Sequence, residues 1–196
     1  MKSGLLLKKV RLLKNLNLIT KMKLFKTSRL IIKTLDRVDF IYFNELFTDS
    51  KILNFIPKKN YTPKHILKRF NSNLNLDINH LKHKEFLCGI FLKHLPEMIG
   101  LAMFLLNAKG QREIGYRFRT LYWGNGYGTE TTNGIINYIF NQLNESLITA
   151  DVNENNSASI KILEKFMNFE KKFYNVTDSC SERRYTLSKE NWLENR

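Results

Sequence analysis

In Tyr122-Trp123-Gly124-Asn125-Gly126-Tyr127-Gly128-Thr129-Glu130, three glycines alternate with larger residues. A strand-like run ends just before this stretch, and a helical pattern begins near its third glycine. Glycine admits positive φ and lets another molecule approach the bare main chain. A turn that enters a helix also points unpaired backbone N–H groups at one spot, where the helix dipole adds positive potential. The stretch predicts a phosphate site, although a tight strand-to-helix connection can need glycine for steric reasons alone.

The composition is that of one globular domain. The chain has 196 residues, of which 43% are hydrophobic and 12% aromatic, enough to bury a core without staples. Cys88 and Cys180 are the only cysteines, which excludes a disulfide framework and a cysteine metal site and favours a cytoplasmic protein. His80 and His83 have metal-ligand spacing but no companion ligands, so we predict no metal site. No apolar run is long enough to span a bilayer.

The positive charge is concentrated at one end of the chain. The formal net charge is +14, yet residues 1–35 contain ten Lys or Arg and no Asp or Glu. Nucleic-acid binding by the whole domain is therefore not predicted. Residues 1–26 form a basic extension in which Leu and Val alternate with Lys and Arg. It can be dispensable, with Met22 as the true start, or residues 1–21 can lie on an anionic membrane or on RNA.

From Arg29 onward, strand and helix patterns alternate. Apolar runs predict strands over residues 30–35, 86–92, 98–106, 112–119, 147–152, 169–174 and 183–187. Apolar residues at helical spacing predict helices over residues 36–48, 62–71, 128–144 and 155–166. The short connections between residues 86 and 119 predict an antiparallel meander. The strand, helix and strand that follow predict a βαβ-like unit around the glycine turn.

The glycine stretch and four other segments together resemble a known family. Gly124–Glu130 is similar to the acetyl-CoA pyrophosphate loop of the GNAT superfamily of N-acetyltransferases, whose pattern is Gln/Arg-x-x-Gly-x-Gly/Ala. Further segments resemble the branch that contains the ribosomal-protein N-terminal acetyltransferases: Thr27-Ser28-Arg29-Leu30, Glu113-Ile114-Gly115-Tyr116, Tyr122-Trp123-Gly124, and Asn156-Ser157-Ala158-Ser159 with Ile162-Leu163-Glu164-Lys165. The resemblance covers about residues 27–187 in the same order.

The resemblance implies both a fold and a cofactor. The expected fold is a single α/β (α+β) domain over residues 27–196, with a mixed, mostly antiparallel sheet of about six or seven strands and about four helices. The expected co-substrate is acetyl-CoA, without a metal. The main chain of the turn would hold the pyrophosphate, and a splayed strand would offer backbone groups to the pantetheine arm. The residues implied in binding are Tyr116, Phe118, Trp123, Gly124, Asn125, Gly126, Tyr127, Gly128, Thr129, Asn156 and Ser159.

Three positions depart from the family pattern. Trp123 replaces the usual Gln or Arg, which removes a side-chain contact to phosphate. Leu163 occupies the position at which other members often have a Tyr general acid. The helix end at Phe166–Phe169 lacks the usual glycine, although Asn168 can adopt the left-handed conformation that ends a helix.

Acetyl transfer to an amine needs a proton acceptor and donors for the departing thiolate. Glu113 is the candidate for the first role, because strand alternation places it on the face opposite Tyr116 and Phe118. It can equally be a solvent-facing strand residue. Ser159, with Asn156, is implied to assist the thiolate. Glu130 is expected only to stabilise the helix dipole.

The sequence thus predicts an N-acetyltransferase that moves an acetyl group directly to a primary amine. The resemblance suggests a protein N-terminus as acceptor, possible partners being ribosomal proteins, while polyamines, antibiotics and free amino acids stay open. The alternative is a non-catalytic module of the same fold that binds RNA or the ribosome through residues 1–21. Neither the acceptor nor the oligomeric state can be read from the sequence.

Overall fold

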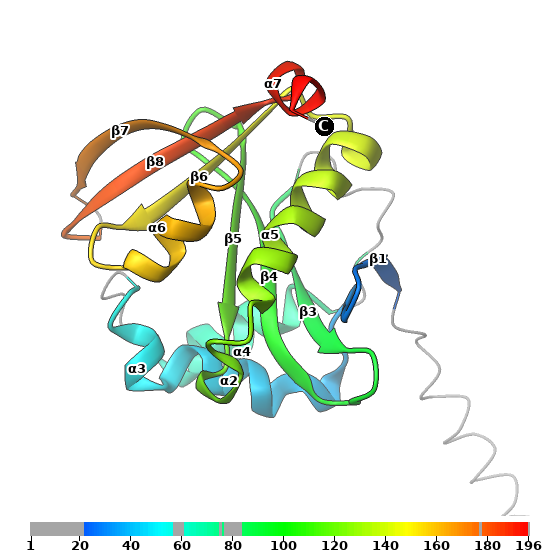
Figure 1. The fold of residues 1–196 in the computed structure, drawn as a ribbon. Helices are drawn as coiled ribbons and strands as arrows, with labels where there is room; N and C mark the ends of the chain where they lie inside the picture. The colour runs from blue at the N-terminus through cyan, green and yellow to red at the C-terminus, as the bar shows by residue number, and fades with distance from the viewer. Residues whose placement is uncertain (1–21, 57–60, 75, 77–83, 177, 196) are drawn as a thin grey trace, which may run out of the picture.

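The structure, a computed structural model, describes residues 22–56, 61–74, 76, 84–176 and 178–195. Eight strands form a single sheet in the order β1-β2-β3-β4-β5-β6-β8-β7 (Figure 1). All neighbouring strands are antiparallel except β5 and β6, which are parallel. The strands are β1 (Lys23–Lys26), β2 (Leu30–Lys33), β3 (Phe86–Leu92), β4 (Met98–Leu106), β5 (Arg112–Phe118), β6 (Leu147–Asn153), β7 (Asn168–Asn175) and β8 (Cys180–Ser188).

The predicted meander and βαβ unit are both present. Strands β3, β4 and β5 pair consecutively, and Gly110 turns the chain between β4 and β5 with φ of 71°. The Gly110 N–H donates to the Asn107 carbonyl at 2.8 Å. Helix α5 (Tyr127–Tyr138), continued by a π-helical turn at Ile139–Leu143, then leads to β6 beside β5. The mixed, mostly antiparallel fold predicted from the sequence is confirmed.

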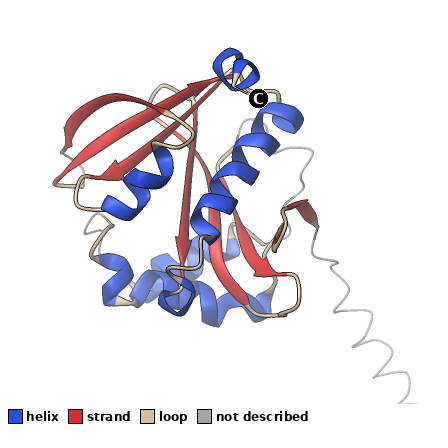
Figure 2. Ribbon diagram, viewed as in Figure 1, coloured by secondary structure: helices blue, strands red, loops and turns tan. Residues whose placement is uncertain are grey.

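Helices cover both faces of the sheet (Figure 2). One face, called here the α5 face, packs apolar residues such as Ile135 and Phe140 against the strands, together with α6 (Ser157–Leu163). The other, called the α2 face, buries residues such as Phe43 and Phe70 under the N-terminal helices. Those helices are α2 (Phe40–Thr48), α3 (Ser50–Leu53) and α4 (Pro63–Asn71), preceded by the short 3-10 turn η1 (Arg37–Asp39).

The sheet is split at β5 and β6. Only Arg112 and Glu113 of β5 pair with β6, opposite Ile148 and Thr149. Beyond Glu113 the two strands diverge. Figure 1 shows β5 running down the middle of the view, while β6 runs to the left beside β8 and β7. The splayed strand predicted from the sequence is therefore present. The split leaves space between the two halves of the sheet at the point where the glycine turn begins.

Several details differ from the sequence-based expectations. Strand β1 was not predicted, because Lys23–Lys26 is short and basic and continues the pattern of the preceding residues. It is nevertheless part of the sheet, and Phe25 packs so closely on α5 that a Cβ on Gly134 would lie 2.7 Å from its ring. The short helices α3 and α7 (Lys189–Glu194) were also missed.

The end of α6 also differs. Among the described non-glycine residues, only Asn144 and Ser179 have positive φ, so Asn168 does not end the helix in a left-handed conformation. Instead, the N–H groups of Phe166 and Met167 donate to the Leu163 carbonyl, and β7 begins directly at Asn168. Within the described residues, no helix combines the length and apolarity needed to cross a bilayer. The extension was predicted over residues 1–26, of which residues 1–21 lie outside the described residues and Lys23–Lys26 form β1. The His80 and His83 pair also lies outside the described residues.

Candidate active site

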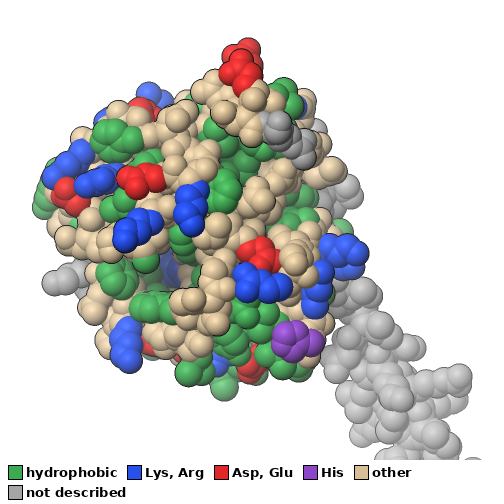
Figure 3. All heavy atoms as spheres, viewed as in Figure 1, with side chains coloured by type: hydrophobic (Ala, Val, Ile, Leu, Met, Phe, Trp, Pro, Cys, Tyr) green, Lys and Arg blue, Asp and Glu red, His purple; other side chains and the backbone are tan. Residues whose placement is uncertain are grey.

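The split in the sheet opens into a large cleft. Its volume is about 1020 Å³, and its walls come from the glycine turn, β5, α6, the arm formed by β6, β7 and β8, and the residues around α3 and α4. The space-filling view is hollowed between this arm and the helices below it (Figure 3). A cleft of this size can hold a cofactor and a second substrate together. Every site residue predicted from the sequence except Thr129 lines it.

The glycine turn presents a row of free backbone donors. Gly124 and Gly126 have φ of 77° and 75°, a conformation that favours glycine. Among the described residues, no protein group accepts the backbone N–H groups from Gly124 to Thr129, and Glu130 is the first of the helix to be bonded, to the Gly126 carbonyl at 3.2 Å. Six orphan donors at a helix N-terminus fit a phosphate group. The free N–H groups of the turn therefore fit a bound pyrophosphate.

The third glycine has a packing role. A Cβ on Gly128 would lie 2.9 Å from Cδ1 of Ile162 on α6 and 3.3 Å from the Tyr116 ring. The absence of a side chain thus lets α5 approach both α6 and β5. A Cβ on Gly124 would meet nothing within 4 Å, so that position is open to a ligand. Gly128 therefore allows close packing of the helix N-terminus beside the cleft, and Gly124 leaves the main chain open to a ligand.

Arg29, in the loop between β1 and β2, fixes the position of the glycine turn. Its guanidinium donates to Oε2 of Glu130 at 2.6 Å through Nε and to the Asn125 carbonyl at 3.0 Å through Nη1. It also lies 4.6 Å from the centre of the Tyr127 ring. Glu130 accepts further bonds from the Arg29 N–H at 2.7 Å and the Thr27 hydroxyl at 2.5 Å. Burial alone would raise the pKa of Glu130, but these bonds outweigh it and lower that pKa.

These hydrogen bonds give Glu130 and Arg29 a structural role that was not predicted from the sequence. Glu130 was expected only to stabilise the helix dipole, whereas it ties the helix to the Thr27–Leu30 segment. Arg29 belongs to that segment, which resembled the family but had no assigned role. The positive charge of Arg29 also stands beside the turn in which Trp123 replaces the usual Gln or Arg.

Strand β5 turns unused backbone groups toward the split. The Arg119 N–H donates to Ile99 of β4 at 3.0 Å, so strand alternation points the polar groups of Tyr116 and Phe118 away from β4. One of these groups is already used, because Nε1 of Trp123 donates to the Phe118 carbonyl at 2.8 Å. The N–H and carbonyl groups of Tyr116 thus supply most of the free backbone hydrogen-bonding groups that were expected to bind the pantetheine arm.

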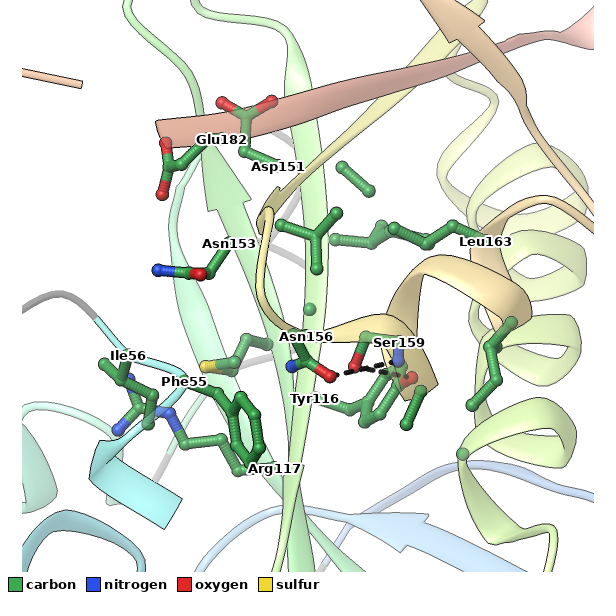
Figure 4. A pocket seen from close by; sticks show the side chains of 18 of the residues that line it. Phe55, Ile56, Tyr116, Arg117, Asp151, Asn153, Asn156, Ser159, Leu163 and Glu182 are labelled. Carbon is green, nitrogen blue, oxygen red and sulfur yellow. Dashed lines mark hydrogen bonds between the residues drawn. The ribbon is translucent and has the colours of Figure 1, made fainter. Parts of the chain in front are cut away.

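Tyr116, Ser159 and Asn156 form a hydrogen-bonded chain at the cleft (Figure 4). The Tyr116 hydroxyl donates to Oγ of Ser159 at 3.3 Å. The Ser159 N–H donates to Oδ1 of Asn156 at 3.1 Å, so Asn156 caps α6. Burial raises the pKa of Tyr116, while its bond to Ser159 opposes the shift. The contact of the Tyr116 hydroxyl was not predicted, because strand alternation does not reveal which residue of a distant helix packs against the strand.

Glu113 lies on the α2 face of β5, opposite Leu105 of β4. The expected orientation, away from Tyr116 and Phe118, is confirmed. Burial raises the pKa of Glu113 to about 7, and the negative charge of Asp151 adds to the shift while Arg184 opposes it. Arg184 binds Asp151 with two bonds of 2.7 and 2.5 Å. Glu113 itself has no hydrogen-bond partner among the described residues, so its carboxyl group is available at the cleft.

Metal chemistry finds no support in the part of the chain that the structure describes. There, no group of three or more His, Cys, Asp or Glu side chains is arranged to hold a metal ion. Cys88 is fully buried, and burial raises the pKa of its thiol far above its usual range. It is therefore unsuited to act as a nucleophile.

Three features of the cleft are those of an acyltransferase that uses acetyl-CoA. They are the split sheet, the helix N-terminus with free donors at the split, and the carboxyl group across the cleft. The chain belongs to the GNAT acetyltransferase family, because the model of the acetyltransferase (GNAT) domain matches residues 29–166. The resemblance stated from the sequence is therefore confirmed.

Individual relatives agree with this assignment. The uncharacterized N-acetyltransferase p20 of Bacillus licheniformis is 36% identical over 77 residues, which are 38% of this chain and 43% of that protein. The chain thus spans less than half the length of this curated relative.

Solved structures share the fold. A GNAT-family acetyltransferase from Bacillus anthracis has a TM-score of 0.73 at 22% identity, over 86% of this chain and 99% of that one. RimL, a ribosomal L7/L12 alpha-N-protein acetyltransferase in complex with coenzyme A, has a TM-score of 0.70 at 13% identity, over 86% and 99% of the two chains.

Proposed function

We propose that this chain is an acetyl-CoA-dependent N-acetyltransferase that moves the acetyl group directly to a primary amine while both substrates are bound. The observation that carries the proposal is the row of free N–H groups from Gly124 to Thr129, because all of these residues except Thr129 line a cleft that Glu113 also lines. Family membership supports acetyl-CoA as the donor. When bound, acetyl-CoA supplies an activated thioester, so the protein needs only to position the amine and move protons.

Glu113 is the proposed general base. A carboxyl group with a pKa of about 7 is partly ionised at neutral pH and can accept the proton that the amine loses. Burial and the negative charge of Asp151 create this value, and the negative charge also attracts a cationic amine toward the carboxylate. The proton can pass directly or through a water molecule. Glu113 acts on the acceptor side, on the α2 face of β5.

Ser159 is the proposed donor toward the leaving sulfur. Because its Oγ accepts a hydrogen bond from Tyr116, its own O–H remains available to point into the cleft. Asn156 fixes the N-terminus of α6 and thereby the position of Ser159. Tyr116 polarises Ser159 from the β5 side, which addresses the departure at Leu163. That position is buried and apolar, so it supplies no acid.

The acceptor amine is a narrower question. The likeness to RimL suggests a protein N-terminus, such as that of a ribosomal protein, although at 13% identity this likeness shows the fold alone. The domain limits of residues 27–196 stay a prediction, to which β1 adds Lys23–Lys26 as part of the same sheet. The role of residues 1–21 and the cytoplasmic location also stay predictions.

A turnover screen tests the proposal. Purified protein and acetyl-CoA are incubated with N-terminal peptides, polyamines, aminoglycosides and free amino acids, and thiol release is followed. We expect release that depends on one acceptor class and the acetylated amine as product. Acetyl-CoA that neither binds nor turns over with any acceptor would exclude the proposal.

The alternative of an RNA-binding module rests on the basic residues 1–21, which lie outside the described residues. It predicts steeply salt-dependent RNA binding that disappears when these residues are deleted. Equal RNA affinity with and without the segment would exclude this alternative.

A further inference from the structure

Two arginines in the wall of the cleft have no carboxylate partner within the part of the chain that the structure describes. Arg117 lies on the α2 face of β5 and Arg69 on α4, and both are half-buried residues that line the cleft. Neither forms an ion pair with any residue of the described ranges. By contrast, Arg112, Arg119 and Arg184 each contact at least one carboxylate. A half-buried guanidinium without a counterion is costly, so its presence in a cleft indicates a ligand.

The two guanidinium groups share one aromatic ring. The guanidinium carbon of Arg117 lies 4.5 Å from the centre of the Phe47 ring, and that of Arg69 lies 5.6 Å from it. Nη2 of Arg117 donates to the Tyr61 hydroxyl at 3.4 Å, a long bond, and its buried Nη1 has no hydrogen-bond partner among the described residues. Burial, with the positive charge of Arg69, lowers the pKa of Arg117. Two like charges therefore face one part of the cleft.

The charges of the cleft are divided along β5. Glu113 and Arg117 project from the same face of the strand, because they pair with Leu105 and Leu101 of the same buried cluster. Four residues of a strand span roughly 13 Å. Asp151 and Glu182 add negative charge near Glu113, and Arg184, which is paired with Asp151, offsets part of it. Arg69 adds positive charge near Arg117. Figure 4 shows Arg117 near Phe55 and Ile56, away from Asp151 and Glu182.

We propose that Arg117 and Arg69 form a subsite for an oxyanion on the acceptor, so that the enzyme acetylates an amine that also carries a carboxylate or a phosphate. The ammonium group would face Glu113, and the oxyanion would take the donors that Arg117 leaves unused. Guanidinium groups bind carboxylate and phosphate with strong, directional hydrogen bonds. This inference rests on the proposed acetyl transfer and narrows its acceptor to a zwitterionic class.

The test compares amines that differ only in the anionic group. ω-Amino acids from glycine to 6-aminohexanoate are set against amino alcohols of the same chain length, and 2-aminoethyl phosphate is set against ethanolamine. We expect kcat/KM to favour at least one anionic acceptor by roughly tenfold or more. The chain length at which the preference is greatest measures the span between the two ends. The carboxylate and phosphate arms show which oxyanion is bound.

Variants locate the preference. Arg117→Gln and Arg69→Gln should each remove most of it, Arg117→Lys should retain part, and Arg37→Gln, which removes an exposed charge outside the cleft, should leave it intact. Thermal melts check that each variant is folded. Equal kcat/KM for anionic and neutral acceptors in the wild type, or a preference that survives in both glutamine variants, would overturn the subsite.

The subsite and the transfer reaction can fail separately. Saturation-transfer NMR detects binding of the same compounds without turnover. Selective binding of anionic amines that is lost in Arg117→Gln would support the subsite even if no acetyl group moved, in which case only the proposed function fails. Acetylation of amines without any anionic preference would leave the proposed function standing and remove the subsite.

Discussion

The two sides of the cleft offer different parts of the chain to a ligand. At the glycine turn, the donors are main-chain N–H groups of consecutive residues, Gly124 to Thr129. Across the cleft, the available groups are side chains from elements distant in sequence, namely Glu113, Arg117 and Arg69. A main-chain site depends on backbone conformation and tolerates most side-chain changes, whereas a side-chain site depends on individual groups. The cofactor site and the acceptor site should therefore respond to mutation in opposite ways.

The largest effect on activity is expected at Glu113, on the side of the cleft formed by side chains. Glu113→Gln should lower kcat/KM by roughly 10²- to 10⁴-fold, because it removes the general base. Acetyl-CoA affinity should be unchanged, since the turn does not involve this residue. With an acceptor whose own pKa lies well below neutrality, the wild-type kcat/KM should fall below pH of about 7, where Glu113 is protonated. The variant should lack this inflection, and an identical inflection in both proteins would remove Glu113 from the reaction.

Glu113 should also lower the free energy of unfolding at neutral pH, because burial disfavours its ionised form in the folded state. Below its ordinary pKa of 4.5, the carboxyl group is protonated in both the folded and unfolded states. Between 4.5 and about 7, only the folded state holds the proton, so stability contributed by this group declines as pH rises. Glu113→Gln should gain up to about 3 kcal/mol relative to wild type at pH 8, and the gain should vanish near pH 4. Urea denaturation at the two pH values measures this, and a gain independent of pH would contradict it.

A smaller effect is expected where the two sides meet, at Ser159. Ser159→Ala and Tyr116→Phe should each lower kcat by roughly tenfold, because both weaken donation to the leaving sulfur. The double variant should be little worse than Ser159→Ala alone, since Tyr116 acts through Ser159. Steady-state kinetics of the four proteins test this coupling. Fully additive losses would show that the two hydroxyls act independently.

The smallest effect is expected behind the glycine turn. Arg29→Ala should raise KM for acetyl-CoA by a few-fold with little change in kcat, because the hydrogen bonds to Glu130 and Asn125 are on an exposed side. Arg37→Ala removes an equally exposed arginine elsewhere and serves as the control. A loss of kcat equal to the loss in kcat/KM would show that Arg29 affects the reaction itself.

The same contrast explains what the sequence could reveal. The glycine turn was predictable because its chemistry lies in consecutive residues whose types serve backbone conformation. The meander, the helix at the turn and the orientation of Glu113 followed from periodicity, which strand alternation carries into space. Strand β1 was missed because Lys23–Lys26 continues a basic pattern, and its strand character depends on pairing with β2.

The rest of the site could not be predicted, because it depends on contacts between distant residues. Arg29 and Glu130 are 101 positions apart, and Tyr116 and Ser159 are 43 apart. Arg69 and Arg117 meet at Phe47 only after α2 and α4 have packed on the sheet. Their lack of a counterion is likewise visible only in the folded chain. Local sequence thus predicts the conformation of the glycine turn and the orientation of Glu113, but not the contacts that bring Arg69 and Arg117 to the cleft and Arg29 to the glycine turn.

The most direct measurement is a calorimetric titration of acetyl-CoA into three proteins. Wild type is compared with Gly126→Val and Gly110→Val, since both glycines have positive φ, of 75° and 71°, but only Gly126 lies in the turn at the cleft. The two substitutions impose a similar backbone cost, so Gly110→Val controls for destabilisation. We expect Gly126→Val to weaken binding by about 100-fold or more and Gly110→Val to bind like wild type. Unchanged affinity in Gly126→Val would contradict the assignment of the turn as the acetyl-CoA site.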